Sequence, residues 1–214
     1  MSIDPNCEID NQVKSEAIQE RIVILGTGWG GFNLANTLKK TDDREISVVS
    51  PSNHFVFTPL LPSTAVGTVE FRAIQEPVRT VPSITNYYHA KAKNIDFDKQ
   101  EILCDTEDQN ERFTLKYDKL VISVGVKTNT FNTPNIAERE GIEVFFLKHL
   151  YHARSIRNRT IQMFENAAIP GLSEDEKKRL LQFVIVGGGP TSCEYGKSGF
   201  SAILQKPYFS ILHC

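Results

Sequence analysis

Two glycine-rich turns, each directly after an apolar run, constrain this chain more than any other feature. The first is Gly26-Thr27-Gly28-Trp29-Gly30-Gly31 after Ile22–Leu25, and the second is Gly187-Gly188-Gly189-Pro190-Thr191-Ser192 after Phe183–Val186. A glycine-rich turn between a buried strand and a helix is typical of dinucleotide binding, because the backbone can approach a pyrophosphate at the helix N-terminus. Two such turns predict two nucleotides, most simply a flavin and a nicotinamide. The second unit, counted from Phe183, has only about thirty residues in which to finish, roughly the minimum for one βαβ unit.

The pattern around the first turn predicts a parallel α/β fold. Ile22–Leu25 is a continuous apolar run, as expected of a parallel strand buried on both faces, and Ile46–Val49 is the next expected strand. Gly28–Lys40 lies between them and carries apolar residues at helical spacing. The expected fold class is α/β, a Rossmann-like FAD/NAD(P)-binding fold with an inserted antiparallel β-meander before a strand at Lys119–Val124. The meander is expected from four short alternating segments, Tyr87–Ala92, Asn94–Phe97, Glu101–Cys104 and Phe113–Lys116.

The remaining elements lead to the second turn. We expect a strand at Val144–Leu147, a helix at His149–Ala167 and a capping box at Ser173–Glu176 that opens a helix to Leu181. A strand at Phe183–Val186 then precedes the second turn, and Tyr208–Leu212 is a candidate strand near the end.

The segment Ser50–Glu70 is predicted as a loop with an unusually apolar part, His54–Pro62. Loops are normally polar, so something must cover this one. It either packs into the core or forms a wall against a flat apolar cofactor ring. Arg72–Thr80 is a candidate short helix interrupted at Pro77.

Composition excludes several classes of protein. The net charge of −2 gives no basic surface for nucleic acid, and no apolar run is long enough to span a membrane. The cysteines show no spacing typical of a zinc site or a redox-active dithiol, so four free thiols in a reducing compartment are expected. They are Cys7, Cys104, Cys193 and Cys214. Residues 1–20 are acidic and lack arginine, which is unlike a mitochondrial presequence and indicates a disordered lead-in.

The glycines of the first turn each have a distinct role. Gly26 allows the tight turn, Gly28 lets the backbone approach the pyrophosphate, and Gly31 lets the helix pack closely on the strand. The amides around Trp29 and Gly30 are expected to point at the phosphates. An acidic residue normally ends the second strand and holds the ribose, but here Ser50 stands in that place.

Several blocks together resemble the type II, or alternative and rotenone-insensitive, NADH:quinone oxidoreductases of fungal and plant mitochondria. The most distinctive is Phe55-Val56-Phe57-Thr58-Pro59-Leu60-Leu61-Pro62, preceded by Val48–Pro51 and followed by Val66–Glu70. Tyr117–Gly125, Thr128–Phe131, Phe146–Lys148, Leu172-Ser173 and Val184–Thr191 complete the resemblance, together with the first turn. It covers Arg21–Glu194 and implies FAD and NADH as cofactors and a quinone as substrate.

The resemblance also implies roles for single residues. The first turn would cradle the FAD pyrophosphate, and Ser50 would take the place of the ribose acid. Thr58, Pro59 and Leu60 would lie near the isoalloxazine, which favours the cofactor-wall interpretation of the apolar loop. The remaining FAD-binding residues would be Ala92 near the adenine, with Ser123 and Gly125 on the other side of the flavin.

The second turn would hold NADH through Gly187, Gly189 and Pro190, and Glu194 would lie close to the nicotinamide as the catalytic candidate. No metal is expected. Ser192 stands where the family has its third glycine, and the resemblance stops after Glu194. We therefore expect an N-terminal portion of such an enzyme, with an FAD-binding domain at 21–148 and an incomplete NADH-binding domain at 149–214.

The same resemblance implies a respiratory-chain enzyme at the mitochondrial inner membrane, although the anchoring segment and a presequence are not visible in this sequence. A homodimer is possible for the full-length family. Two alternatives remain: a remnant that binds FAD without catalysis, or another pyridine-nucleotide flavoprotein reductase. The Phe57–Pro62 block argues against the latter.

Overall fold

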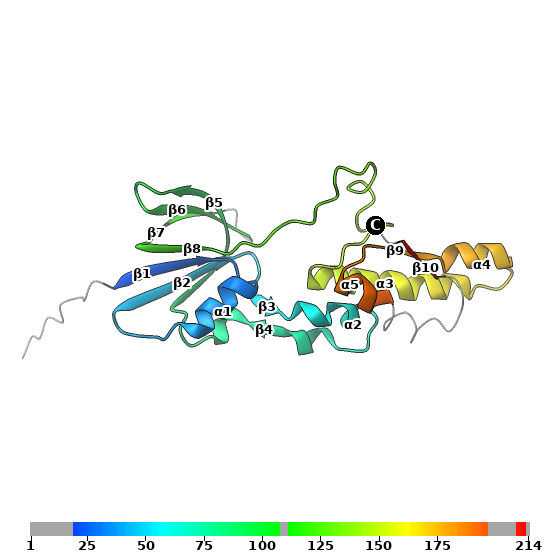
Figure 1. Cartoon of the computed structure of the whole chain (residues 1–214), viewed down its shortest axis with the longest axis horizontal. Coiled ribbons are helices and arrows are strands. Elements are labelled where there is room, and N and C mark those ends of the chain that lie inside the picture. The colour runs from blue at the N-terminus through cyan, green and yellow to red at the C-terminus, as the bar shows by residue number, and fades with distance from the viewer. Residues whose placement is uncertain (1–18, 108–110, 197–208, 213–214) are drawn as a thin grey trace, which may run out of the picture. The chain divides into compact units, whose positions relative to one another are not determined.

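The computed structural model describes residues 19–107, 111–196 and 209–212, and the chain divides into two compact units (Figure 1). The first comprises Met1–Asn53 and Val81–Val124, and the second comprises His54–Thr80 and Gly125–Cys214. The expected lead-in falls almost wholly outside the described residues. The domain division at residue 148 stays a prediction.

The first unit is a six-stranded sheet in the order β7-β6-β5-β2-β1-β8. β5, β2, β1 and β8 run parallel, whereas β6 and β7 add antiparallel strands beyond β5. This arrangement confirms the expected α/β class with its meander. The elements are β1 Glu20–Leu25, α1 Trp29–Thr37, β2 Arg44–Ser50, β5 Asn86–Asp96, β6 Glu101–Thr106, β7 Arg112–Lys116 and β8 Lys119–Ile122.

One long strand, β5, replaces the two short strands expected at Tyr87–Ala92 and Asn94–Phe97. Its first residues pair with β2 in parallel, and from Ala90 onward it pairs with β6 in the antiparallel sense. The register shifts between Ala92 and Asn94, so one extra residue stands in β5 at that point. A bulge of this kind reverses the inside-outside alternation, which explains why the sequence pattern is broken there.

Two elements of the first unit end earlier than expected. The helix predicted to reach Lys40 ends at Thr37, where Leu38 leaves the helical conformation with a ψ of 136°. The buried hydroxyl of Ser83 donates a hydrogen bond to the Ala35 carbonyl and so satisfies one acceptor of the last turn. The strand predicted to reach Val124 ends at Ile122.

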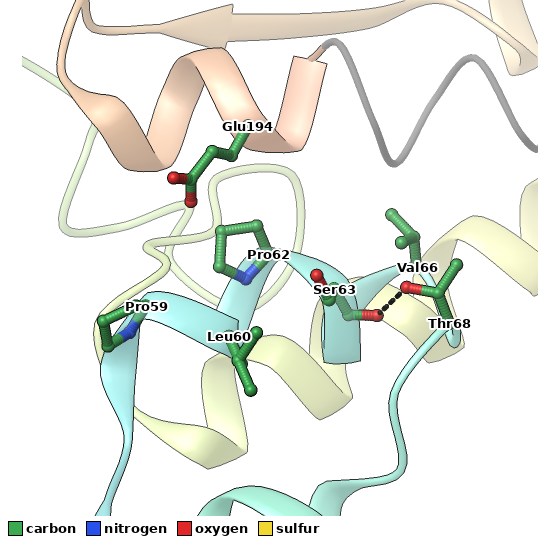
Figure 2. A pocket seen from close by; sticks show the side chains of 7 residues that line it. All are labelled: Pro59, Leu60, Pro62, Ser63, Val66, Thr68 and Glu194. Atoms are coloured by element: carbon green, nitrogen blue, oxygen red, sulfur yellow. Dashed lines mark hydrogen bonds between the residues drawn. The ribbon is translucent and has the colours of Figure 1, made fainter.

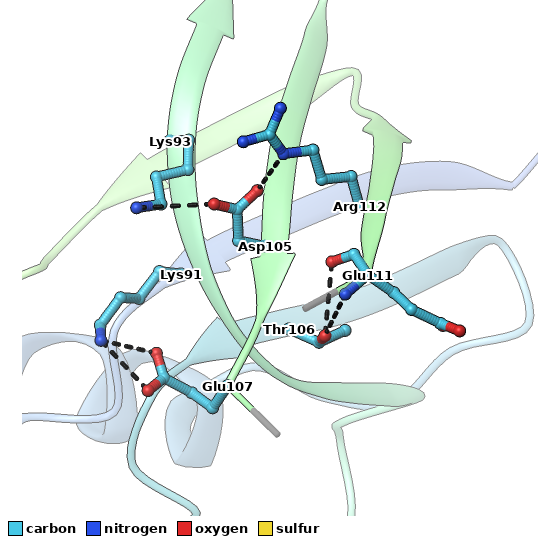
Figure 3. A network of polar contacts seen from close by, with 7 residues as sticks. All are labelled: Lys91, Lys93, Asp105, Thr106, Glu107, Glu111 and Arg112. Atoms are coloured by element: carbon cyan, nitrogen blue, oxygen red, sulfur yellow. Dashed lines mark hydrogen bonds and ion pairs between the residues drawn. The ribbon is translucent and has the colours of Figure 1, made fainter. Parts of the chain in front are cut away.

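The meander carries its polar residues as cross-strand pairs (Figure 3). Lys91 pairs with Glu107 at 2.8 Å, and Asp105 lies between Lys93 at 3.5 Å and Arg112 at 3.0 Å. The other side of these strands contributes Ile102 and Cys104, both fully buried, to the core. Partly exposed pairs of this kind add little stability, and charges on an edge strand such as β7 discourage pairing with another chain.

The second unit contains the remaining elements. They are β3 His54–Val56, η1 Thr58–Leu60, α2 Leu61–Ala65, η2 Phe71–Ile74, β4 Gln75–Pro77, η3 Val78–Thr80, α3 Leu150–Ala167, α4 Glu174–Leu180, β9 Phe183–Val186, α5 Pro190–Glu194 and β10 Phe209–Leu212. β3 pairs with β4 in the antiparallel sense, and β9 pairs with β10 in parallel. The capping box before α4 is present, with the Glu176 amide donating to the Ser173 hydroxyl at 3.3 Å.

Three expectations for the second unit are wrong. The Ser50–Glu70 loop contains β3, η1 and α2, and the helix expected at Arg72–Thr80 is divided into η2, β4 and η3. The strand expected at Val144–Leu147 is absent from the described residues, where Val144 makes only an isolated bridge to Glu140. Phe146 instead sets its ring edge-on to His152, and Leu147 packs against the core of this unit, so side-chain packing replaces strand pairing.

The core of the second unit joins the apolar segment to α3. Leu61 and Ala65 of α2 are buried with Ile74 and with Ala153 of α3. Arg154 and Arg157, one turn apart on α3, place their guanidinium carbons 5.2 and 5.6 Å from the centroid of the Phe71 ring. Among the described helices, none is both long and apolar enough to cross a bilayer.

Candidate functional site

The first glycine turn is closely packed on one side. Gly26 has a φ of +101°, which favours glycine. A Cβ on Gly31 would lie 2.0 Å from the Gly26 carbonyl oxygen and 2.7 Å from the Ser123 hydroxyl. Only glycine therefore allows α1 to lie this close to the turn and to the end of β8.

The other side of the same turn is open. Gly28 precedes α1 in an extended conformation, and a Cβ placed on it would meet nothing within 4 Å. Gly28 and Gly30 are exposed, and Trp29 begins the helix with 44% of its surface exposed. An anion can thus reach the N-terminus of a nine-residue helix without meeting a side chain of these glycines. These features fit the pyrophosphate of a dinucleotide.

Ser50 ends β2 beside the first turn, but its side chain is buried with 3% exposure. Its hydroxyl lies 2.9 Å from the Thr27 hydroxyl and accepts a hydrogen bond from the Ser52 amide at 3.1 Å. The Tyr87 hydroxyl donates to the Ser50 carbonyl at 2.9 Å. The residue expected at the ribose therefore takes part in a polar network behind the turn.

Ala92 and Ser123 occupy different places in the first unit. Ala92 is half-buried in β5, directly before the bulge, and packs against the core. Ser123 follows β8, and both its amide and its hydroxyl donate to the Leu25 carbonyl, at 2.9 and 2.8 Å. The sheet thus brings Ser123 to the first turn.

The second glycine turn has nearly the same backbone conformation as the first, but Ser192 occupies the position of the third glycine. Gly187 has a φ of +130°, and Gly189 precedes α5 in an extended conformation, with Pro190 as the first helical residue. A Cβ on Gly187 would lie 2.8 Å from the Ser192 hydroxyl oxygen. The serine therefore fills space beside the turn, while Cβ positions on Gly188 and Gly189 remain open.

A cavity of about 350 Å³ in the second unit brings the apolar segment and Glu194 together (Figure 2). Figure 2 shows Glu194 extending from α5 toward the segment that carries Pro59 and Pro62. The lining residues are Pro59, Leu60, Pro62, Ser63, Val66, Thr68 and Glu194. Thr58, the first residue of η1, directly precedes this lining, and Gly125 begins the second stretch of the unit with a φ of +70°.

Four lining residues were missed from sequence: Pro62, Ser63, Val66 and Thr68. Together with Pro59, the first three are spaced at i, i+3, i+4 and i+7, which is the helical pattern. The prolines hid this signal, because they favour a loop interpretation although proline is well tolerated in the first turn of a helix.

Tyr195 also emerged only from the structure. Burial raises the pKa of its phenol to about 12, and a side-chain hydrogen bond joins it to Thr160 of α3. It packs against the Leu61 core as well. The residue next to Glu194 is therefore anchored to α3, which limits where Glu194 can lie.

The cysteines in the described residues are free. Cys193 is exposed on α5, and burial raises the pKa of the Cys104 thiol to about 11, which makes it inert. Cys7 and Cys214 lie outside the described residues. In the described parts, no cluster of three or more His, Cys, Asp or Glu side chains is arranged to hold a metal ion.

Residues 20–203 match the family described as pyridine nucleotide-disulphide oxidoreductase, and the chain belongs to this family. A probable NADH dehydrogenase of Dictyostelium discoideum is 45% identical over 191 residues, which are 87% of this chain and 41% of that protein. The external alternative NAD(P)H-ubiquinone oxidoreductase B1, mitochondrial, of Solanum tuberosum is 41% identical over 206 residues, 91% of this chain and 34% of that protein. The expected resemblance to alternative NADH:quinone oxidoreductases is thereby confirmed.

The fold is confirmed by solved structures. NDH2 of Plasmodium falciparum in complex with NADH has a TM-score of 0.78 at 31% identity, covering 91% of this chain and 41% of that chain. The same enzyme in complex with RYL-552 gives a TM-score of 0.79 over the same coverage. The chain thus spans about two fifths or less of the length of these relatives.

Proposed function

We propose that this chain is the FAD-binding part, with the beginning of the NADH-binding part, of a non-proton-pumping NADH:quinone oxidoreductase. A bound FAD would supply the electron-accepting chemistry between NADH and a quinone. The proposed division into an FAD-binding domain at 21–148 and an NADH-binding domain from 149 onward follows the two turns. The mitochondrial names of the relatives support placement at the mitochondrial inner membrane, in the respiratory chain.

The first unit would hold the adenine-dinucleotide part of FAD. The open side of Gly28, Trp29 and Gly30 at the N-terminus of α1 would receive the pyrophosphate, and Gly26 and Gly31 would keep α1 close to the turn. Ala92 would lie near the adenine, Ser50 stands at the position of the ribose acid, and Ser123 would border the flavin, as would Gly125, which belongs to the second unit.

The second unit would contribute the wall of the reaction site. Thr58, Pro59 and Leu60 would lie along the flavin ring and exclude water from it. Gly187, Gly189 and Pro190 would bind the NADH pyrophosphate. Glu194 is the proposed polar group near the nicotinamide, where an acceptor such as a carboxylate can orient an amide or hold a proton.

The observation that carries this proposal is the shared cavity of Pro59, Leu60 and Glu194. These residues are far apart in the sequence, yet they line one apolar-walled space with a single carboxylate. Such a space suits a flat ring system with one polar contact.

The test is an anaerobic titration of the purified chain, reconstituted with FAD, by NADH. Loss of the visible flavin absorbance, restored by adding a soluble quinone, supports the proposal. Flavin that binds but keeps its absorbance would identify a remnant without catalysis, and restoration by a protein acceptor but not by quinone would identify another reductase.

Glu194→Gln sharpens this experiment, because it removes the charge while keeping the shape. We expect the rate of bleaching to fall by about 10- to 100-fold at unchanged FAD affinity, because a hydrogen bond to a charged group contributes about 1.5–3 kcal/mol. Glu165→Gln, an exposed glutamate on α3, is the matched control and should bleach at the wild-type rate. If Glu194→Gln and Glu165→Gln bleached at the same rate, Glu194 would have no role in the reaction.

A further inference from the structure

A buried group of hydroxyls lies directly behind the first glycine turn. Thr27, the residue between the first two glycines, is 5% exposed, and Ser50 at the end of β2 is 3% exposed. The Thr27 hydroxyl donates to the Ser52 carbonyl at 2.9 Å and lies 2.9 Å from the Ser50 hydroxyl. The Ser52 amide donates to the Ser50 hydroxyl at 3.1 Å.

The direction of each bond in this group follows from counting hydrogens. A hydroxyl has one hydrogen to donate, and Thr27 gives its hydrogen to the Ser52 carbonyl. The bond between the two hydroxyls must therefore be donated by Ser50 and accepted by Thr27. Ser50 donates to Thr27, Thr27 donates to Ser52, and the Ser52 amide returns a bond to Ser50, which closes a ring. The bond between the two hydroxyls is buried and the two bonds to Ser52 are partly buried. Consecutive hydroxyl bonds of this kind polarise, and so reinforce, one another.

This ring leaves Ser50 with no hydrogen for a ribose oxygen, and its burial keeps it from solvent. We propose that Thr27 and Ser50 are positioning residues that hold the first glycine turn ready for the FAD pyrophosphate, and that Ser50 acts through Thr27 rather than as a ribose ligand. The inference rests on the proposed FAD binding. In this arrangement a preformed turn takes the place of an acidic residue that would bind the ribose directly.

The surroundings of the turn support this role. On the β2 side, the Tyr87 hydroxyl holds the Ser50 carbonyl at 2.9 Å. On the β8 side, the Ser123 hydroxyl holds the Leu25 carbonyl at 2.8 Å, directly before Gly26. A turn rich in glycine has more backbone freedom than other turns, so ordering it before binding lowers the entropy cost of binding.

The test measures the FAD dissociation constant of the full chain by flavin fluorescence for Thr27→Val, Ser50→Ala and the double variant. Thr27→Val keeps the shape and removes the hydroxyl. Each single variant should weaken FAD binding about tenfold, the effect of leaving a buried hydrogen-bond partner unsatisfied. Because both belong to one ring, the double variant should lose little more than either single variant.

Two kinds of control keep this test decisive. Thr27→Ser retains the hydroxyl and should bind FAD within about twofold of wild type, since the ring persists. Thr37→Val, on the exposed part of α1, and Ser83→Ala, which breaks a buried bond to the Ala35 carbonyl, repeat the same chemical changes away from the turn. Both should keep wild-type FAD affinity, even where Ser83→Ala lowers the melting temperature.

The outcomes separate the inference from the proposed function. Losses that multiply in the double variant, to about a hundredfold, would show that Ser50 contacts the ribose independently of Thr27 and would overturn the inference. Wild-type affinity in all ring variants would overturn it as well, while FAD binding itself stands. No FAD binding by the wild-type chain would reject the proposed function, and the inference with it.

Discussion

The two glycine turns share a backbone but differ in what surrounds them. Gly28 and Gly189 have nearly the same extended conformation, with φ of −76° and −78° before their helices. Gly26 and Gly187 both have positive φ. The first two glycines of the motif therefore set the shape of the turn in both places, whatever the rest of the domain does.

The third position decides how close the helix comes to the turn. At Gly31 there is no room for a Cβ, because the Gly26 carbonyl would lie 2.0 Å away. At the corresponding place in the second turn, Ser192 has a side chain and lies beside Gly187. A serine at this position of the motif is therefore accommodated by a looser fit between α5 and its turn.

The strands that precede the turns differ still more. β1 lies between β2 and β8, and Ile24 is fully buried. β9 pairs with β10 in the described part of the chain, and its Val184 and Val186 are 52% and 68% exposed. A similar apolar run thus has a core environment in one case and a half-exposed one in the other.

The largest difference is expected from removing side chains on these strands. Ile24→Ala should destabilise the first unit by about 2–5 kcal/mol, because it leaves a cavity in a packed core. Val184→Ala should cost less than about 1 kcal/mol, because its side chain is already half in water. Urea unfolding followed by fluorescence of Trp29, the single tryptophan of the chain, reports the first unit, and far-ultraviolet circular dichroism reports the helices of the second. Equal costs would mean that β9 is as buried as β1 in solution.

A smaller contrast is expected at the third position of the turns. Gly31→Ala should cost about 1–3 kcal/mol through overpacking, and should weaken FAD binding by moving α1. Ser192→Ala should change stability by less than about 0.5 kcal/mol, since that site already holds a Cβ. The same two optical probes apply. A harmless Gly31→Ala would show that α1 can move away from its turn as freely as α5.

The smallest effect concerns the ion pair between Arg21, at the start of β1, and Asp118. The Arg21 guanidinium and amide bind the Asp118 carboxylate, with contacts of 2.7 to 3.1 Å, and lower its pKa to about 2. Because the pKa of Asp118 is lower in the folded state, the ion pair stabilises the fold at pH values above the ordinary pKa of Asp. This stability is lost as the pH falls from about 4 toward 2. The side chains are 39% exposed, so the effect is modest.

Melting temperatures between pH 7 and 2 check this point. Asp118→Asn should have a lower melting temperature than wild type at pH 7, and the gap should close near pH 2. Arg21→Gln should flatten the profile only in part, because it removes the guanidinium but keeps the backbone amide that also donates to Asp118. If the difference in melting temperature between wild type and Asp118→Asn stayed constant over this range, the Arg21–Asp118 ion pair would not contribute to the pH dependence of stability.

Much of the molecule was predictable because its signals are local. Both turns, their preceding strands, the long helix α3 and the capping box of α4 follow from short patterns whose meaning hardly depends on distant residues. The elements that were predicted wrongly depend instead on residues that are distant in the sequence. The β5 bulge depends on its pairing with β6, and Leu147 leaves its expected strand for a core formed with α2.

The α/β class, the family and the positions of the two glycine turns could be predicted from the amino-acid sequence alone, because each rests on short local patterns of glycine, apolar and capping residues. The shared cavity of Glu194, Pro59 and Leu60, and the inward orientation of Ser50 toward Thr27, became visible only in the folded chain. Both arrangements depend on packing between segments distant in the chain. A hydroxyl or carboxylate takes its role from the partners that such packing brings within hydrogen-bond distance.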